Sequence, residues 1–494
     1  MIVNKEQIDC VITDPNTGEQ YESKELIVSY VDTEGQIKYL RYPIPRDQMY
    51  LWQYSNRQFA DPTWRSFDNK WVKRVRTDQL NEYRMNELLC SFGPAVDPLF
   101  GLNGPDTWFC DIETNVEEEF PEPDPANQPV NTIALTHFPR TIVWSRKNLT
   151  EKEKKYIQDK ISNHPDAYVR QYKFEFKYFE TEVDMLFDFF KFIQPLPAVS
   201  GWNFLGYDWL YLYNRSVKVL GMDISWISPT GHFYNFSISN KLGKRNVMLP
   251  YHKVIYDYLM VYQKWDHSVK VKENNTLDFV AGEVLGYKKI QHKLGFKDFY
   301  EKEFPDYVFY NLIDTILVEQ IDKKIHTANI WYAITGGVKC ELNHSFSTVK
   351  PTEIALVNFS YREQKVVPVK KKLDIEQSSY EGAFVWPTQP GIYKYIGGLD
   401  FQSLYPKTML QFNMSPETFL FRDTTGTYVP KPNEIKTASG AVFTKDFEGI
   451  VPKIIRHYFA LRKASKAKRK QVDLEYETLK HFYEERKANI AKAA

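Results

Sequence analysis

Hydrophobic positions alternate between strand-like and helix-like spacing through the middle of the chain. Short apolar runs bounded by turn residues, TWFCDIET at residues 107–114 and AVSGWNF at residues 198–204, predict strands. Residues 151–161 and 182–193 have helical spacing, and residues 312–330 carry an apolar stripe of the same period. Because strands alternate with helices, we expect an α/β sheet in this part of the chain.

The pattern changes towards the C-terminus. Residues 453–494 contain no Gly or Pro, and polar residues lie nearly all round the long helix or helical pair that they predict. This segment has twelve Lys and Arg residues and five Asp and Glu residues, a net charge of +7. The whole chain carries only +1, which conceals this basic surface. Such a surface suits an anionic ligand, and a solvated helix face is the alternative.

Length and composition predict a folded, multidomain protein. The chain has 494 residues, enough for about three domains, and 43% of them are hydrophobic. The four cysteines, Cys10, Cys90, Cys110 and Cys340, lie far apart without metal or redox spacing, so we expect reduced thiols. The N-terminus has no signal-peptide pattern and no apolar run reaches the ~18 residues of a membrane span. We therefore expect a soluble, intracellular protein with no membrane partner.

Three segments carry acidic residues that could share one metal site. Asp111 and Glu113 are two residues apart on a predicted strand, so both side chains project from the same face. Asp208 follows a second strand in an aromatic setting, where an unpaired carboxylate would be costly. Tyr310 and Asp314 share one face of a predicted helix. Taken singly, the Asp111–Glu113 pair and Asp314 are more often solvated acids, whereas Asp208 needs a metal or a cation. Together the four supply the ligands for two-metal phosphoryl hydrolysis.

The same segments resemble a known family. DIET, GWNFLGYD followed by YNR, and the Y-x-x-x-D of Tyr310 and Asp314 are similar to the three exonuclease motifs of the family B DNA polymerases, in the form found in T-even-like bacteriophages. YEGAFV at residues 380–385 resembles the family's linker between exonuclease and polymerase domains. Residues 399–418 resemble polymerase motif A, and EGIVPKIIRHYFALRKASKAK looks like the start of the fingers helix. The resemblance covers nearly the whole chain, although the first hundred residues match only loosely.

The resemblance implies a 3′→5′ proofreading exonuclease. Its two metal ions, Mg²⁺ or alternatively Mn²⁺, would be held by Asp111, Glu113, Asp208 and Asp314. Tyr310 would orient the attacking water. The implied substrates are primer-template DNA and single-stranded 3′ ends, and residues 237–246 are assigned to the tip of a hairpin that separates primer from template.

The resemblance also implies part of a polymerase site. Asp400, at the end of the predicted strand KYIGGLD, would bind a metal ion, although an acid followed by SLYP is also typical of a turn. Tyr405 would be the steric gate that excludes a ribose 2′-OH. The positions that would bind the incoming dNTP are Ser403, Leu404, Tyr405, Arg462 and Lys466. Arg462 and Lys466 are four residues apart on one helical face, which suits phosphate binding.

Four domains follow from the resemblance, within an overall α/β (α+β multidomain) fold class. They are a β-rich N-terminal domain over residues 1–104 with a return segment over 330–372, an RNase H-like exonuclease domain with a mixed sheet over 105–329, a partial palm over 373–450 and a fingers helix over 451–494.

The sequence has no D-T-D motif and no K-x-x-x-N-S-x-Y-G motif, both of which the family's polymerase site needs. We therefore expect an N-terminal subunit or fragment of a phage replicative DNA polymerase in the host cytoplasm, and no polymerisation by this chain alone. A separate C-terminal chain would complete the site and contact the sliding clamp. Two alternatives stay open: a stand-alone single-strand exonuclease with a vestigial motif A, and a non-catalytic DNA-binding assembly module.

Overall fold

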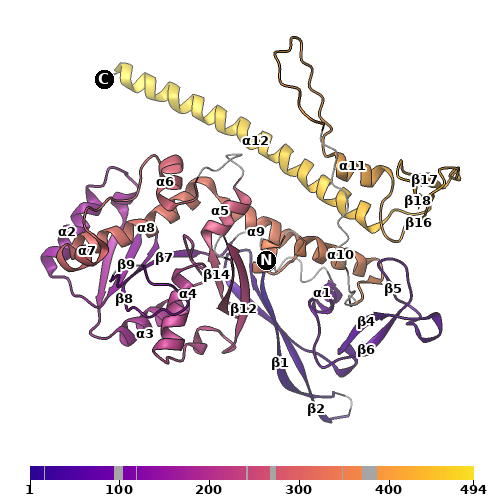
Figure 1. Cartoon of the computed structure of the whole chain (residues 1–494), viewed down its shortest axis with the longest axis horizontal. Coiled ribbons are helices and arrows are strands. Elements are labelled where there is room, and N and C mark those ends of the chain that lie inside the picture. Colours follow the sequence, from indigo (N-terminus) through magenta and orange to yellow (C-terminus); the bar gives the residue numbers. More distant parts are fainter. Residues whose placement is uncertain are drawn as a thin grey trace. The chain divides into compact units, whose positions relative to one another are not determined.

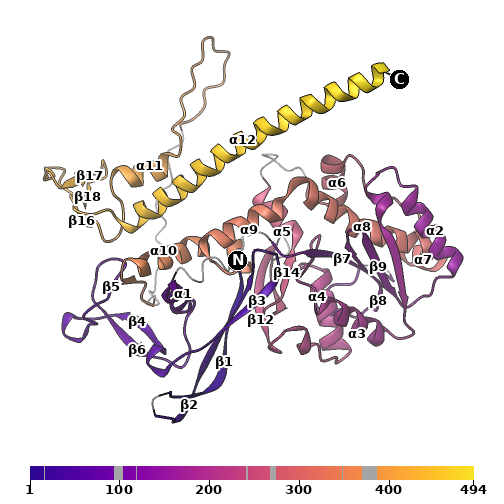
Figure 2. The same cartoon turned by 180° about the vertical axis from the view of Figure 1, so that it is seen from behind.

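The computed structural model describes residues 1–15, 17–93, 104–117, 120–240, 243–266, 274–347, 349–369 and 386–493. The chain forms two compact units (Figure 1, and from behind in Figure 2). The first comprises Met1–Gln48 and Ser91–Ile354, and the second comprises Met49–Cys90 and Ala355–Ala494. Each unit is therefore built from two separate stretches of sequence.

A six-stranded mixed sheet forms the centre of the first unit. Its strand order is β10 (Lys173–Tyr178), β9 (Arg140–Ser145), β8 (Val130–His137), β7 (Thr107–Thr114), β11 (Ala198–Gly201) and β14 (Val254–Asp257). β7, β8 and β9 are antiparallel neighbours, and the other neighbouring pairs are parallel. This sheet, flanked by helices, confirms the predicted α/β fold class.

Helices cover both faces of the sheet, and each face has its own apolar core. On one face, α8 (Phe304–Ile325) packs over β7 and β8, and its core includes Phe109 of β7. On the other, α3 (Glu182–Ile193) and α4 (Asp208–Tyr213) enclose a core that includes Cys110 and Ile112. The apolar residues of β7 thus serve both faces, as the two-residue period of a strand dictates.

The remaining helices of the chain before residue 363 are α1 (Glu82–Ser91), α2 (Glu151–Ser162), α5 (Tyr258–Trp265), α6 (Leu277–Leu285), α7 (Phe296–Lys302), α9 (Thr327–Val338) and α10 (Lys350–Arg362). The predicted helices at 151–161, 182–193 and within 312–330 are confirmed by α2, α3 and α8. α2 begins with a capping box in which Thr150 and Glu153 satisfy each other's backbone N–H groups. Within the described ranges, no helix is long and apolar enough to cross a membrane.

Two antiparallel elements complete the first unit. β1 (Ile2–Thr13), β2 (Gln20–Val31) and β3 (Ile37–Pro43) form a three-stranded sheet. β12 (Phe233–Asn240) and β13 (Gly243–Pro250) form a hairpin in which Phe233 pairs with Pro250. The two strands confirm the predicted hairpin, and residues 241–242 lie outside the described ranges.

The second unit combines small sheets with the longest helix. Its paired strands are β4 (Tyr50–Tyr54) with β6 (Val72–Arg76), β5 (Arg65–Ser66) with β15 (Lys365–Val366), and β18 (Ala441–Thr444) between β16 (Phe419–Arg422) and β17 (Glu434–Lys436). α11 (Leu404–Gln411) and α12 (Ile450–Ala493) follow the chain towards its end. The single uninterrupted α12 confirms the predicted long helix. The β5–β15 pair joins the expected return segment to the N-terminal residues.

The prediction of a strand that ends at Asp400 is wrong. The structure has no strand within residues 386–403, and the side chains of Ile392, Ile396 and Leu399 are almost fully exposed. A strand forms only where a neighbour pairs its N–H and C=O groups, and none of the described strands does so here. The linker-like YEGAFV lies outside the described residues.

Candidate active site

Strand β7 presents two carboxylates on one face of the sheet. Asp111 pairs with Ala134 of β8, and Glu113 pairs with Thr132. Ile112, between the two acids, is buried in the core on the opposite face. The prediction that Asp111 and Glu113 project together is confirmed.

Helix α8 adds a third carboxylate. Asp314 is only 2% exposed, so it does not lie at the solvent edge of its helix. One carboxylate oxygen from each of Asp111, Glu113 and Asp314 lies within 4.8 Å of the other two. Oδ1 of Asp314 is buried and has no hydrogen-bond partner among the described residues. Three converging carboxylates with a free buried oxygen fit a hard divalent cation.

Asp208 lies beside these three carboxylates, at the open edge of β7. It is the first residue of α4 and does not follow β11 directly. β11 pairs with β7 only as far as Phe109, so the backbone of Ile112 is free on that side. Oδ1 of Asp208 accepts a 3.0 Å hydrogen bond from the Ile112 N–H. Asp208 is therefore held next to the residue that separates Asp111 from Glu113.

Burial raises the pKa of all four carboxyl groups. The pKa of Asp111 rises to about 7, first through burial and then through the nearby charge of Asp314. Burial, followed by the charge of Asp111, also raises the pKa of Glu113 and of Asp208 well above the ordinary range. Burial raises the pKa of Asp314, although Lys289 opposes the shift. A cation bound between such groups favours their ionised forms, so binding is coupled to proton release.

Lys289 belongs to this site, and sequence reasoning missed it. Its Nζ lies 2.5 Å from Oδ2 of Asp314 and 5.1 Å from the ring centroid of Tyr310. Its backbone N–H donates to Oδ1 of Asp278, which fixes the segment to the first turn of α6. Lys289 stands in an irregular segment beside another lysine, so no local spacing singled it out. Tyr310 is on α8 where its spacing from Asp314 placed it.

Asn311 was also missed. Its Nδ2 donates a 2.7 Å hydrogen bond to Oδ2 of Asp111, and its Oδ1 accepts one of 2.9 Å from the Thr132 hydroxyl. The side chain therefore orients Asp111 and ties α8 to β8. Asn311 precedes Asp314 by three residues on one helix, so helical spacing could have identified it.

The loop after β7 is held in place by side chains that donate hydrogen bonds to its main-chain carbonyl oxygens. The donors are four side chains: Tyr207 just before α4, Tyr211 in α4, and Asn214 and Arg215 in the π-helix (Asn214–Val219) that follows it. The acceptors are the main-chain carbonyl oxygens of Pro121, Pro123, Ala126, Asn127 and Gln128. Arg215 also forms a buried ion pair of 2.7 Å with Glu182. Residues 121–128 are thus anchored to the segment that carries Asp208.

A basic pocket in the second unit contains several of the predicted nucleotide-binding residues. It has a volume of about 310 Å³ and is lined by Gln402, Ser403, Lys407, Phe459, Arg462, Lys463 and Lys466. The structure therefore brings Ser403 together with Arg462 and Lys466. Leu404 and Tyr405 are not in the lining and are 50% and 70% exposed. Asp400 is exposed on the irregular segment before α11.

Two family models match the parts of the chain that carry these residues. The model of the family B DNA polymerase exonuclease domain matches residues 103–270, and the model of DNA polymerase family B matches residues 348–490. The first match contains three of the four site carboxylates, and the second contains the basic pocket.

The chain is also similar to individual polymerases. It is 26% identical to the DNA-directed DNA polymerase of Escherichia phage RB69, over 72% of this chain and 41% of that protein. It is 30% identical to the DNA-directed DNA polymerase of Enterobacteria phage T4, over 61% of this chain and 34% of that protein. It is 26% identical to the DNA polymerase delta catalytic subunit of Glycine max, over 59% of this chain and 28% of that protein. The chain thus spans less than half the length of each of these relatives.

Proposed function

Because the chain belongs to the family B DNA polymerases, we propose that its first unit is a 3′→5′ exonuclease that removes nucleotides from single-stranded DNA ends. The observation that carries this proposal is the convergence of Asp111, Glu113 and Asp314 within 4.8 Å, with Asp208 hydrogen-bonded beside them. These four side chains would hold two divalent ions, with Mg²⁺ as the expected metal. Such ions, when bound, generate a hydroxide nucleophile and stabilise the leaving oxygen.

The residues of the chain have distinct parts in this proposal. Asn311 holds the Asp111 carboxylate in one orientation through its 2.7 Å hydrogen bond. Lys289 stabilises the ionised form of Asp314, which is the form that binds a cation. The hydroxyl of Tyr310 would orient the attacking water, as the family resemblance suggests. Because the carboxylates are buried, an unpaired 3′ end reaches them more readily than a base-paired one.

We also propose that the second unit contributes to a nucleotidyl-transfer site. Arg462 and Lys466, in the wall of the pocket with Ser403, would bind the triphosphate of a dNTP. Asp400 would bind a metal ion there, and Tyr405 would act as the steric gate. Neither Asp400 nor Tyr405 lies in the described pocket, so their roles rest on the family resemblance alone.

A separate polypeptide that completes this site is a further part of the proposal. α12 exposes several large apolar side chains in its second half, namely Val472, Leu474, Tyr476, Leu479, Phe482 and Tyr483. Ile392, Ile396 and Leu399 are exposed as well. Large apolar surfaces of this kind favour a protein partner. A stable 1:1 complex with a chain carrying the family's remaining polymerase motifs supports this idea; failure to associate contradicts it. Contact with a sliding clamp through that chain stays a prediction.

Degradation of a 5′-labelled single strand in the presence of Mg²⁺ tests the exonuclease. Asp111→Ala/Glu113→Ala should lower the rate by at least about 100-fold. The double substitution removes ligands of the metal ions, which stabilise the charge of the transition state by several kcal/mol. Asp306→Asn is the matched control, because Asp306 lies in the first turn of α8 and pairs with Lys160. An activity that the double substitution leaves unchanged contradicts the proposal. DNA binding without any hydrolysis by the wild type favours a non-catalytic binding module.

A further inference from the structure

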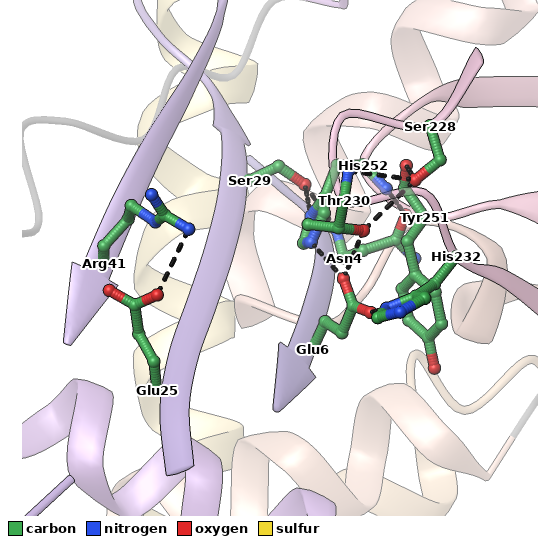
Figure 3. Close-up of polar contacts among 10 residues, drawn as sticks. All are labelled: Asn4, Glu6, Glu25, Ser29, Arg41, Ser228, Thr230, His232, Tyr251 and His252. Atoms are coloured by element: carbon green, nitrogen blue, oxygen red, sulfur yellow. Dashed lines mark hydrogen bonds and ion pairs between the residues drawn. The ribbon is translucent and has the colours of Figure 1, made fainter. Parts of the chain in front are cut away.

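One carboxylate ties both ends of the β12–β13 hairpin to the N-terminal sheet. Glu6 is on β1, and its Oε1 lies 2.5 Å from Nδ1 of His232, the residue before β12. Its Oε2 accepts a 2.7 Å hydrogen bond from the Thr230 hydroxyl and lies 2.9 Å from Nε2 of His252, just after β13. Figure 3 shows these three side chains gathered around the Glu6 carboxylate. We call Glu6, Thr230, His232 and His252 the Glu6 clasp.

Two members of the Glu6 clasp, Glu6 and His252, are buried, whereas the side chain of His232 is exposed. Glu6 is 6% exposed and His252 is 1% exposed. Nδ1 of His252 lies 2.9 Å from Oγ of Ser29, and the His252 N–H donates to Oδ1 of Asn4 at 2.9 Å. His252 has a φ of 62°, a left-handed conformation that a non-glycine residue keeps only where its surroundings hold it.

Hydrogen bonding keeps the Glu6 carboxylate ionised despite its burial. Burial by itself raises the pKa of Glu6, but hydrogen bonds from His252, Thr230 and His232 outweigh burial and lower it. A buried charge is tolerated only where donors surround it. Replacing the carboxylate with an amide turns one of its two acceptor oxygens into a donor, so His232, Thr230 and His252 can no longer keep all three contacts as they are.

Beyond the Glu6 clasp, the hairpin contacts the segment that carries Asp208 and the loop after β7. Arg245 of β13 donates to the Gly206 carbonyl at 3.3 Å and pairs with Glu122 at 3.3 Å. Gly206 is two residues before Asp208, and Glu122 belongs to the fixed loop after β7. The Trp209 indole donates to the carbonyl of Met248 at 2.9 Å. One face of the hairpin is thus fixed next to the exonuclease site.

The opposite face of the hairpin is polar near its end. Ser237 donates a 2.7 Å hydrogen bond to Asn246, and both side chains are exposed, as is Lys244. A two-stranded hairpin is only marginally stable in water by itself. Its direction therefore depends on the packed face and on the base that the Glu6 clasp holds.

We propose that Glu6 is a positioning residue that fixes the base of the β12–β13 hairpin, the element to which the family resemblance assigns separation of primer from template. This inference rests on the proposed exonuclease function. It makes the N-terminal sheet a determinant of the preference between duplex and single-stranded substrates. Strand separation is needed only for a paired end, so the Glu6 clasp affects duplex DNA selectively.

The test compares one oligonucleotide alone and annealed to its template, in the full chain with Mg²⁺. Glu6→Gln keeps the shape of the side chain but removes the charge. It should lower the rate on the duplex by about tenfold, the equivalent of one lost hydrogen bond to a charged group, and leave the single-strand rate unchanged. Glu25→Gln is the matched control: Glu25 is in the same sheet and pairs with Arg41 at 3.2 Å, away from the hairpin (Figure 3).

Hydrogen exchange gives an independent readout. Glu6→Gln should speed exchange of amides in residues 233–240 and 243–250, while the amides of β7 and α8 keep their protection. A parallel loss on both substrates, an unchanged duplex-to-single-strand ratio, or the same loss in Glu25→Gln overturns the positioning role of Glu6. A wild type without single-strand hydrolysis overturns the proposed exonuclease itself, which is a distinguishable result.

Discussion

Lys289 neutralises part of the negative charge of the carboxylate site. Its ammonium group lies 2.5 Å from Asp314, on an irregular segment between α6 and α7. Burial by itself lowers the pKa of Lys289, but the charge of Asp314 outweighs burial and raises it, so the lysine is cationic. The Lys289 ammonium group therefore stabilises the ionised form of Asp314 before any metal ion binds.

Lys289→Met should therefore shift the pH dependence of hydrolysis. Without the ammonium group the pKa of Asp314 rises further, so a higher pH is needed to ionise the ligand. We expect a rate about 10- to 100-fold lower near neutral pH, with partial recovery at alkaline pH. The pH–rate profile of single-strand degradation measures this shift. Lys288→Met is the control, because Lys288 is exposed; an equal loss there contradicts a specific role for Lys289.

Asp111 links stability to pH in the opposite sense from an ordinary salt-bridged acid. Its pKa is about 7 in the folded protein and 3.8 in the ordinary case, so the native state binds more protons between these values. Without divalent ions, its contribution to stability is therefore present at low pH and is lost as the pH rises towards 7, by about 1.4 kcal/mol per pH unit for one group. Asp111→Asn should flatten this decline in denaturant titrations. A decline of unchanged slope contradicts the assignment.

At the scale of elements, local spacing predicted side-chain faces but not long-range neighbours. The two-residue period placed Asp111 and Glu113 together, and the helical period placed Tyr310 and Asp314 on one face. The strand before Asp400 was wrong because apolar alternation does not say whether a pairing partner exists. The hydrogen bond from Ile112 to Asp208 could not be predicted either, since it depends on where β11 leaves β7.

Gly201 is the point at which β11 leaves β7, and its missing side chain is required there. A Cβ atom would lie 2.3 Å from the Cys110 carbonyl oxygen, which is backbone and cannot move aside cheaply. Gly201→Ala should therefore destabilise the protein by about 1–3 kcal/mol in urea titration and slow single-strand hydrolysis. Gly337→Ala, in α9 with open space around the added atom, should be neutral or stabilising. Equal stabilities of the two variants contradict this account.

At the scale of the whole molecule, the motifs located the family matches, but no local pattern showed which distant segments group together. The exonuclease and polymerase matches lie in the regions that the motifs indicated. The four-domain division stays a prediction, whereas the chain clusters into two units that each combine distant segments. Residues 49–90 group with the C-terminal part, and the β5–β15 pair shows the kind of contact that makes this so. Pairing across such a separation leaves no local pattern in the sequence.

We expect the basic pocket of the second unit to bind phosphate groups through the charges of its lining residues. In the presence of Mg²⁺, Arg462→Ala/Lys466→Ala should weaken binding of a fluorescent dNTP by at least about tenfold, because two charge-assisted contacts to phosphate are lost. Lys480→Ala, on the same helix but outside the pocket lining, should have little effect. Binding that resists both the double substitution and added salt contradicts phosphate recognition at this pocket.

The loop after β7 is anchored at five positions through main-chain carbonyl oxygens, so an exposed side chain between these anchors is replaceable. Every residue type offers the same carbonyl group to Tyr207, Tyr211, Asn214 and Arg215, whatever its side chain. Asp124 is exposed between two of the anchored positions. A fluorophore attached at this position through an introduced cysteine would report the binding of DNA ends by a change in its fluorescence. Its attachment point is held in place by the anchored residues on either side.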